Sequence, residues 1–341
     1  MAISTSIREL PDLITTYLQC NLVPMITGSP GIGKSDVIRQ VAEQFNLKVI
    51  DLRLAQMDPV DMLGFASRND KTGKGFYLPM ETFPLQSDPI PAGYAGWLLF
   101  LDEITSAKDA IQAAAYKLIL DRMVGSNPLH KNVAIVAAGN KESDNAIVNP
   151  MSSALKSRMV HLEVDVNPAH FCEYAASKGW DPRIISYLNF RPDNVYTFKP
   201  DSTGATYACP RTWEFTNRLM PKIKIDSFKA LTLLAGCLDE GVALEFQAFC
   251  AIQKELPDLG MIMRNPEHAQ IPEEPSVLWA LCGEISAKMT EANAPQYVKF
   301  IKRVSVECRV ITMRQAIKRL PALGKMDEVK AMIAQDAAAY A

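Results

Sequence analysis

The stretch that decides the fold of this chain runs from Gly28 to Ser35 and reads GSPGIGKS. It fits the pattern G-x-x-x-x-G-K-[ST], which is typical of loops that hold the phosphates of a nucleoside triphosphate. An apolar run of strand length, Leu22 to Thr27, precedes the loop, and Asp36 to Ala42 follows it with helical character. In that context unpaired backbone N–H groups and the helix dipole face the phosphates and form an anion site. The alternative is a chance glycine turn before a helix. Such a turn would not need a strand before it as well as a helix after it, and both are indicated here.

Individual positions of this loop suit phosphate binding. Gly31 and Gly33 can adopt the backbone angles that turn N–H groups inward. Lys34 is expected to reach the β- and γ-phosphates, and the hydroxyl of Ser35 to ligate Mg²⁺. The residues predicted to bind ATP are Gly28, Ser29, Pro30, Gly31, Ile32, Gly33, Lys34, Ser35 and Asp36.

Two acidic residues, Asp102 and Glu103, end the apolar run Trp97–Leu101. A continuous apolar run is typical of a strand covered on both faces. Both carboxylates are therefore expected at the carboxyl edge of the sheet, where ligands bind in open α/β folds. Asp102 suits a ligand of Mg²⁺, and Glu103 suits a general base for an attacking water, which together predict hydrolysis of ATP to ADP and phosphate. A strand that merely ends in two solvated acids is the alternative.

Three further residues are weaker candidates for catalysis. Asn140 follows the buried run Asn132–Ala138 and could help hold the water near the γ-phosphate, although Gly-Asn after a strand is also an ordinary turn. Arg158 could direct its charge at a neighbour's γ-phosphate, an effect that reaches about 10³- to 10⁵-fold in rate. Arg211 opens a helix after Pro210 and could report the nucleotide state by bridging two domains.

The order of the predicted elements indicates the fold class. Strands at Lys48–Leu54, Trp97–Glu103 and Asn132–Ala138 alternate with helices, which predicts a three-layer α/β sandwich around a parallel sheet. The turn signal Asp70–Gly75 predicts a projecting hairpin or loop. After about residue 165 the strands stop and helical patterns follow.

Composition limits the remaining possibilities. A length of 341 residues suggests two or three domains, and 48% hydrophobic with 22% charged residues is typical of a globular protein. The net charge of -2 gives no overall reason to expect nucleic acid or a membrane surface as a partner. Seven cysteines without a C-x-x-C pair favour reduced thiols in the cytosol. The first residues lack a signal-peptide core and no apolar run approaches the ~18 residues of a membrane span, so we expect a cytoplasmic protein with no membrane segment.

Taken in order, these motifs resemble those of the AAA+ ATPases, and most closely their MoxR branch, over residues 20 to about 220. GSPGIGKS is similar to the Walker A motif and LLFLDEIT to Walker B, whereas VAAGN is similar to the sensor 1 strand. ALKSRM resembles the segment that carries the arginine finger, and CPRTW the start of the sensor 2 helix. DPVDMLGF resembles the segment before the helix-2 insertion of this branch. Lys141 stands where the family has proline, and Met159 where it has phenylalanine.

The resemblance implies three regions: a nucleotide-binding α/β core at residues 1–165 with an insert hairpin at about 66–82, a helical lid with sensor 2 at 166–225, and a helical C-terminal region at 226–341. It also implies a ring, usually a hexamer, in which Lys34 and Asn140 of one subunit face the Arg158 of the next, while Arg211 acts from the lid. The implied activity is remodelling or chaperoning of a protein partner, such as one with a von Willebrand factor A domain.

Other functions stay open at this stage. A nucleic-acid-dependent ATPase, such as a helicase, loader or restriction-type motor, is the main alternative, and nucleic acid stays a possible partner. Between Lys299 and Arg319 seven basic residues stand against one acid, which indicates either a solvated helix face or a docking patch. A scaffold that uses ATP only to set its oligomeric state and a small-molecule kinase are further alternatives.

Overall fold

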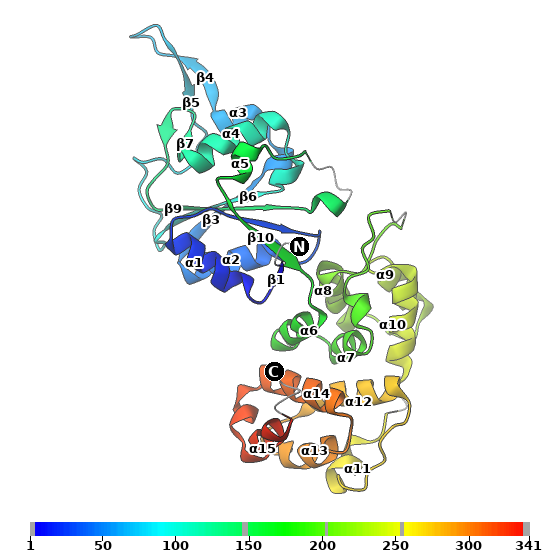
Figure 1. Ribbon diagram of the computed structural model, residues 1–341. Coiled ribbons are helices and arrows are strands. Elements are labelled where there is room, and N and C mark those ends of the chain that lie inside the picture. The colour runs from blue at the N-terminus through cyan, green and yellow to red at the C-terminus, as the bar shows by residue number, and fades with distance from the viewer. Residues whose placement is uncertain (1–3, 145–148, 202–203, 253–255, 337–341) are drawn as a thin grey trace. The chain divides into compact units, whose positions relative to one another are not determined.

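The computed structural model describes residues 4–144, 149–201, 204–252 and 256–336. The chain divides into two compact units. The first extends to Val166 and includes Lys199–Asp201, and the second comprises the rest. The first unit is built on a sheet and the second on helices (Figure 1).

The first unit contains a six-stranded sheet in the order β1-β10-β2-β9-β6-β3, and all its neighbouring strands are parallel. The strands are β1 (Ser4–Ser6), β10 (Val160–Asp165), β2 (Pro24–Gly28), β9 (Val133–Gly139), β6 (Gly96–Asp102) and β3 (Leu47–Arg53). Because every strand runs in the same direction, the carboxyl ends of β2, β9 and β6 meet at one edge. That edge carries the glycine loop, Asp102 and Asn140.

Helices cover both faces of this sheet (Figure 1). On one face lie α1 (Leu10–Gln19) and α2 (Lys34–Gln44), and on the other α3 (Pro59–Leu63) and α4 (Asp109–Leu120). The apolar residues of β6 are all buried, as expected for a central strand between two helical layers. The predicted α/β sandwich with a parallel sheet is confirmed.

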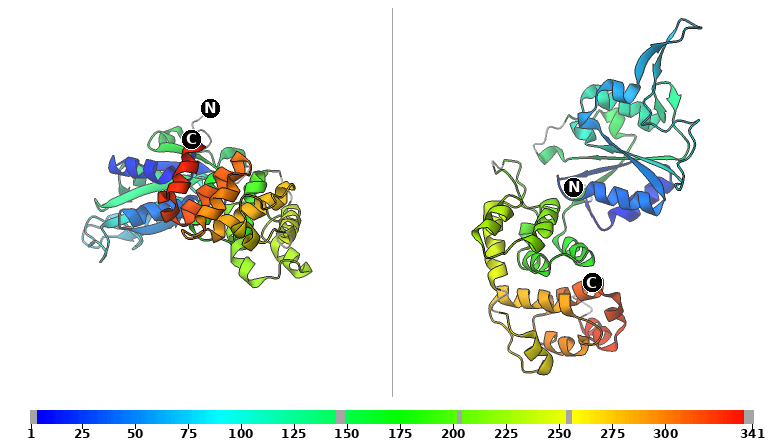
Figure 2. Two further views of the ribbon diagram at one scale, coloured as in Figure 1. Left: turned by 90° about the horizontal axis from the view of Figure 1, so that it is seen from below. Right: turned by 180° about the vertical axis from the view of Figure 1, so that it is seen from behind.

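Two antiparallel hairpins extend the first unit. The predicted turn at Asp70–Gly75 lies between β4 (Phe65–Arg68) and β5 (Gly75–Leu78), and this hairpin projects from the unit (Figure 2). Every residue of its two strands is exposed. A second hairpin joins β7 (Met123–Val124) to β8 (Asn127–Pro128).

Two strands lie outside the sequence predictions. β10 pairs with β2, and the short β1 pairs with β10 at the edge of the sheet. The segment VHLEVD of β10 buries Leu162 and Val164, leaves Glu163 between them half-buried and exposes His161 and Asp165 on either side. This alternation is a strand signal, but it is only six residues long and follows directly on the short helix α5 (Ser153–Lys156).

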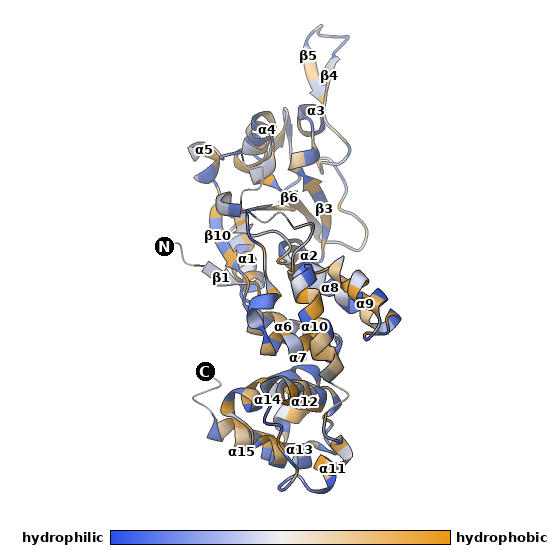
Figure 3. Cartoon of the chain, turned by 90° about the vertical axis from the view of Figure 1, so that its right-hand side faces the viewer, coloured by the Kyte–Doolittle hydropathy of each residue, from blue (hydrophilic) through white to orange (hydrophobic). Residues whose placement is uncertain are grey.

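The second unit is helical, as predicted for the chain after about residue 165. Its helices are α6 (Pro168–Ser177), α7 (Pro182–Phe190), α8 (Pro210–Leu219), α9 (Phe228–Ala235), α10 (Glu240–Ile252), α11 (Leu259–Arg264), α12 (Pro275–Lys288), α13 (Ala294–Ile301), α14 (Val306–Arg319) and α15 (Asp327–Gln335). Orange and blue residues share these helices in Figure 3, as expected when one face packs inward.

Helices from distant parts of the second unit pack tightly together. α7 packs against α12, and α6 packs against α14. At the α7–α12 contact, a Cβ atom added to Gly283 would lie only 1.6 Å from Oγ of Ser186. Only glycine therefore allows the two helices to approach this closely. Within the described part of the chain, no helix is both long and apolar enough to cross a membrane.

Candidate functional site

The glycine loop connects β2 to α2 and has the backbone expected of an anion site. Gly31 and Gly33 have φ angles of 79° and 96°, in the region that favours glycine. Gly28 lies against the neighbouring strand, since a Cβ atom there would stand 2.9 Å from the carbonyl oxygen of Val164. The loop is thus held close to the sheet, and α2 begins at Lys34 with its N-terminus next to the loop.

Lys34 is buried at the centre of the site, with 9% of its surface exposed. Its Nζ donates hydrogen bonds to the carbonyl oxygens of Gly28 at 2.5 Å and Ser29 at 3.0 Å, and to Oδ1 of Asn140 at 3.3 Å. The ammonium group therefore connects the glycine loop to the end of β9. All these acceptors are neutral, so an anionic phosphate oxygen would compete with them for the ammonium group.

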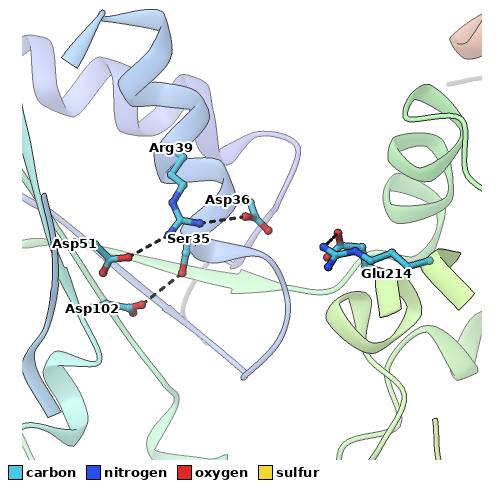
Figure 4. A network of polar contacts seen from close by, with 7 residues as sticks. Ser35, Asp36, Arg39, Asp51, Asp102 and Glu214 are labelled. Carbon is cyan, nitrogen blue, oxygen red and sulfur yellow. Dashed lines mark hydrogen bonds and ion pairs between the residues drawn. The ribbon is translucent and has the colours of Figure 1, made fainter. Parts of the chain in front are cut away.

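Ser35 and Asp102 lie together at the edge of the sheet (Figure 4). The hydroxyl of Ser35 donates to Oδ2 of Asp102 at 3.5 Å. Burial raises the pKa of Asp102, and the nearby carboxylates of Asp51 and Glu103 also raise it, against the hydrogen bond from the backbone N–H of Glu103 and the charge of Lys34. The paired hydroxyl and carboxylate oxygens are the donor types that Mg²⁺ prefers.

A small ion-pair network lies beside this pair. Arg39 contacts Asp36 at 3.8 Å and Asp51 at 3.1 Å, as Figure 4 shows. Asp36 is exposed and faces Arg39. The second carboxylate, Asp51, belongs to β3, the strand that pairs with β6, and it adds negative charge near Asp102.

Glu103 follows Asp102 in a left-handed backbone conformation, with φ at 57° and ψ at 32°. This conformation is uncommon for a residue other than glycine and costs energy. Its backbone N–H donates to Oδ1 of Asp102 at 2.9 Å, so the turn also fixes the Asp102 side chain. Glu103 is half-buried at the same edge of the sheet as Lys34 and Asp102.

Asn140 is held by the turn that follows Glu103. Its backbone N–H donates to Oγ1 of the buried Thr105 at 3.0 Å, while its side chain accepts from Lys34. A Cβ atom at Gly139 would come within 2.6 Å of Thr105, so glycine is needed before Asn140. The end of β9 is therefore fixed against the end of β6, with the amide of Asn140 turned toward the glycine loop.

The two candidate arginines lie outside this set of contacts. Arg158, just after α5, is exposed and donates to the carbonyl oxygen of Ala154 at 3.1 Å and to Oγ of Ser157 at 2.7 Å. Its guanidinium lies 5.2 Å from the ring centre of Tyr116, a cation–π contact. Arg211 is the exposed second residue of α8, in the other unit.

Residues 24–159 match the family described as AAA domain, dynein-related subfamily. The first unit has the AAA+ fold. The matched segment includes the glycine loop, Asp102, Glu103 and Asn140, and it supports an ATPase of the AAA+ group that binds nucleotide.

Solved structures give looser matches. The chain is 19% identical to NtrX from Brucella abortus over 64% of its own length and 52% of that chain, with a TM-score of 0.39. It is 15% identical to NtrX in complex with ADP, over 99% of its own length and 70% of that chain, with a TM-score of 0.37. Against a mutant of RuvB from Thermotoga maritima it is 16% identical, over 86% of each chain, with a TM-score of 0.39. The chain thus spans about half of the first NtrX structure, and no curated protein matches it.

Asp144 contacts the glycine loop, and it was not singled out in the sequence analysis. It is buried, with 8% exposed, and its Oδ1 accepts a hydrogen bond of 3.2 Å from Oγ of Ser29 in the glycine loop. Its Oδ2 is buried and has no hydrogen-bond partner among the described residues. The two residues are far apart in the sequence and belong to no common motif, so no local signal links them.

Lys141, which stands where the family has proline, has a structural role. It forms ion pairs with Glu163 at 2.8 Å and Asp165 at 2.6 Å, both on β10. Burial lowers the pKa of Lys141, but the hydrogen bonds to Asp165 and Glu163 outweigh burial and raise it. Lys141 thereby ties the segment after Asn140 to the far side of β2.

Much of the basic stretch Lys299–Arg319 binds the chain itself. Arg303 donates to the carbonyl oxygens of Pro266 and Ala269, both at 2.8 Å. Arg309 forms a buried ion pair with Asp336 at 2.6 Å, and Arg319 donates to the last turn of α12. These contacts favour a structural role for the three arginines over a role in docking a partner.

Proposed function

We propose that this chain hydrolyses ATP at the carboxyl edge of its parallel sheet. The observation that carries the proposal is the convergence of Lys34, Ser35, Asp102 and Asn140, which come from three separate places in the chain and contact one another there. The glycine loop supplies backbone N–H groups for the phosphates. The donor set of the site suits a nucleoside triphosphate with its cation.

In this proposal Lys34 exchanges its neutral acceptors for the phosphate oxygens and positions the β- and γ-phosphates. The Ser35 hydroxyl and the Asp102 carboxylate, which contact each other, would hold Mg²⁺, because oxygen donors of these types are the ligands that it prefers. When bound, Mg²⁺ supplies positive charge against the phosphates. The positive charge would also offset the cost of burying the Asp102 carboxylate.

Glu103 and Asn140 act on the attacking water. The Glu103 carboxylate accepts a proton from the water as its oxygen attacks the γ-phosphate. The left-handed turn at Glu103 fixes the Asp102 side chain through a backbone hydrogen bond, and we assign Asp102 to the cation and Glu103 to the proton. The Asn140 amide, held by Lys34 and Thr105, orients the water or the γ-phosphate.

The finer assignment is a MoxR-like ring, in which the chain remodels a protein partner, one with a von Willebrand factor A domain being the type we favour. The motif order and the exposed β4–β5 hairpin support this branch. We assign Arg158 to the active site of the neighbouring subunit, because it is exposed and lies outside the Lys34 contacts. We assign Arg211 to sensing of the nucleotide from a helical lid at residues 166–225, ahead of a helical region at 226–341.

Two variants test the chemistry. Lys34→Ala should lose binding of a fluorescent ATP analogue, whereas Glu103→Gln should bind the analogue normally and lose about 10²- to 10⁴-fold in the rate of phosphate release. Lys48→Ala, which removes an exposed lysine on β3, is the matched control and should change neither measurement. Normal phosphate release by Glu103→Gln would show that Glu103 is not the base.

The same Glu103→Gln form tests the class of partner. Incubated with ATP, it should retain a protein when recovered from native cytosol. Retention of nucleic acid, with turnover of the unmodified protein stimulated by DNA in a salt-dependent way, would instead favour the helicase or loader alternative.

A further inference from the structure

Lys141 joins two strands that do not pair with each other. It follows directly on Asn140, after the end of β9. Its Nζ lies 2.8 Å from Oε1 of Glu163 and 2.6 Å from Oδ1 of Asp165, both on β10. In the sheet, β2 lies between β9 and β10. The two ion pairs therefore connect the strands on either side of β2, the strand that leads into the glycine loop.

The end of β10 also holds the start of the glycine loop. Gly28 pairs with Val164, the residue between the two acids. A Cβ atom added to Gly28 would stand 2.9 Å from the carbonyl oxygen of Val164, so loop and strand are in close contact. The same three residues of β10 thus hold both the glycine loop and Lys141. The segment after Asn140 and the phosphate loop therefore share one rigid support.

Lys141 and Thr105 restrain Asn140 from opposite sides along the chain. The backbone N–H of Asn140 donates to Oγ1 of Thr105 at 3.0 Å, which fixes the peptide group that enters the residue. The peptide group that leaves Asn140 belongs to Lys141, whose ion pairs fix it to β10. Because the direction of a side chain follows from the peptide groups on both sides, the two restraints together direct the amide. Oδ1 of Asn140 accordingly lies 3.3 Å from Nζ of Lys34.

The two ion pairs suit a geometric role better than a stabilising one. The side chains of Glu163 and Asp165 are 37% and 54% exposed. The hydrogen bond from Lys141 lowers the pKa of Asp165, so this carboxylate is charged at neutral pH. Ion pairs in such partly exposed places contribute little to the free energy of unfolding. Loss of these pairs should therefore change the direction of Asn140 more than the stability of the fold.

We propose that Lys141 is a positioning residue, whose ion pairs with β10 keep the Asn140 amide directed at the γ-phosphate. This inference rests on the ATP hydrolysis proposed above. Lys141 acts only through Asn140 and contacts no reacting atom. Without the ion pairs the amide points in several directions, and a smaller share of bound ATP is in the geometry for attack. Binding of ATP is preserved, because Lys34 and the contact between Ser29 and Asp144 are unchanged.

Lys141→Ala tests the proposal with two independent measurements. Hydrogen exchange followed by mass spectrometry should be faster for a peptide spanning residues 139–144. This segment loses its anchor on β10 and includes the N–H of Asp144, which donates to the carbonyl oxygen of Lys141 at 3.1 Å. In assays of phosphate release, kcat should fall about tenfold while KM for ATP stays within about twofold. The melting temperature should change by less than about 2 °C.

Three further variants separate the ion pairs from other effects. Lys141→Arg keeps a cation for both acids and should retain the original exchange and kcat. Glu163→Gln combined with Asp165→Asn removes the two negative charges while the lysine stays, and should change both measurements in the same direction as Lys141→Ala. Lys288→Ala removes an ion pair of 2.6 Å on α12. It is the matched control and should change neither measurement.

A double variant shows whether Lys141 acts through Asn140. Asn140→Ala alone should lower kcat, and adding Lys141→Ala should lower it no further, because no amide remains to be positioned. Losses that multiply would overturn the inference, and so would unchanged exchange or an unchanged kcat in Lys141→Ala alone. Absence of phosphate release from the unmodified protein would instead refute the proposed function, and hydrogen exchange would still decide whether Lys141 holds the segment.

Discussion

The carboxylate of Asp102 lies next to Ser35 at the end of β6, and burial raises its pKa above the ordinary value of 3.8. The folded chain therefore binds the proton of Asp102 more tightly than the unfolded chain. Stability from this group is fully present below a pH of about 3.8 and is lost as pH rises through the raised pKa. At neutral pH the folded chain carries the full cost of the ionised carboxylate.

We predict that Asp102→Asn is more stable than the original protein at neutral pH, because asparagine has no charge to bury. Its melting temperature without nucleotide or added metal should be higher by about 2–4 °C at pH 7.5, and the gain should shrink as pH falls toward 4. ATP turnover should be lost in the same variant. Asp70→Asn, in the exposed hairpin turn, is the control and should shift neither property. A lower melting temperature for Asp102→Asn at neutral pH would contradict the argument.

The contact between Ser29 and Asp144 gives a second prediction at this scale. Asp144→Ala and Ser29→Ala should each raise KM for ATP with a smaller effect on kcat, because the hydrogen bond positions the loop without touching the reacting atoms. A double-mutant cycle should show a coupling free energy of about 0.5–1.5 kcal/mol. Asp144→Asn retains an acceptor and should restore most of the affinity. Additive effects of the two alanine variants would show that the contact does not position the loop.

Part of the candidate site could be predicted from short sequence motifs. Lys34, Ser35 and Asp102 were readable because each stands next to a strand or loop that decides its place. Asp144 and Thr105 were not, since their partners are remote in sequence and depend on how β9 and β6 end side by side. Hydrogen bonds of this kind follow from the packed sheet rather than from periodicity.

At the scale of elements, Gly64 controls the base of the β4–β5 hairpin. Its φ is 89° and its ψ is 179°, a conformation that only glycine adopts readily. A Cβ atom there would lie 2.1 Å from the carbonyl oxygen of Leu78, on the opposite strand. The hairpin therefore joins the unit through a position with no room for a side chain.

Gly64→Ala should displace the hairpin and lower the free energy of unfolding by about 1–3 kcal/mol. Limited proteolysis should cut faster between residues 65 and 78, while basal ATP turnover should stay within about twofold, because the hairpin is separate from the Lys34 contacts. Gly73→Ala also lies at positive φ, in the exposed turn, but nothing crowds its Cβ position beyond Arg68 at 3.8 Å. Gly73→Ala should therefore lower the free energy of unfolding less than Gly64→Ala does. Equal proteolysis in both variants would argue against the steric account.

β9 and β6 were predictable because each is a continuous apolar run, and the edge strand β3 was predictable from its alternating pattern, whereas β1 and β10 were not predicted. β1 has three residues and no apolar run, and β10 has only two buried positions. Their pairing depends on β2 already being in place, so tertiary contacts decide it. Short strands with few buried residues thus carry the weakest sequence signal in this sheet.

At the scale of the whole molecule, the placement of Arg158 matters most. Its guanidinium contacts the carbonyl oxygen of Ala154 in α5 and the ring of Tyr116, and it makes none of the contacts described for Lys34. A ring would place it at the boundary with the next subunit, where each active site draws residues from two chains. Such a head-to-tail interface repeats around a closed ring.

Mixing two inactive variants tests this arrangement. Arg158→Ala and Lys34→Ala should each be inactive alone, yet an equal mixture should regain turnover, because a site is complete where an Arg158→Ala subunit meets the intact arginine of a Lys34→Ala neighbour. Random mixing makes about a quarter of the sites complete, so about a quarter of the original rate is expected. Lys34→Ala mixed with Glu103→Gln is the matched control and should stay inactive, since both defects lie in the same half of the site. If native mass spectrometry shows mixed assemblies and the first mixture remains inactive, Arg158 does not act on a neighbouring subunit.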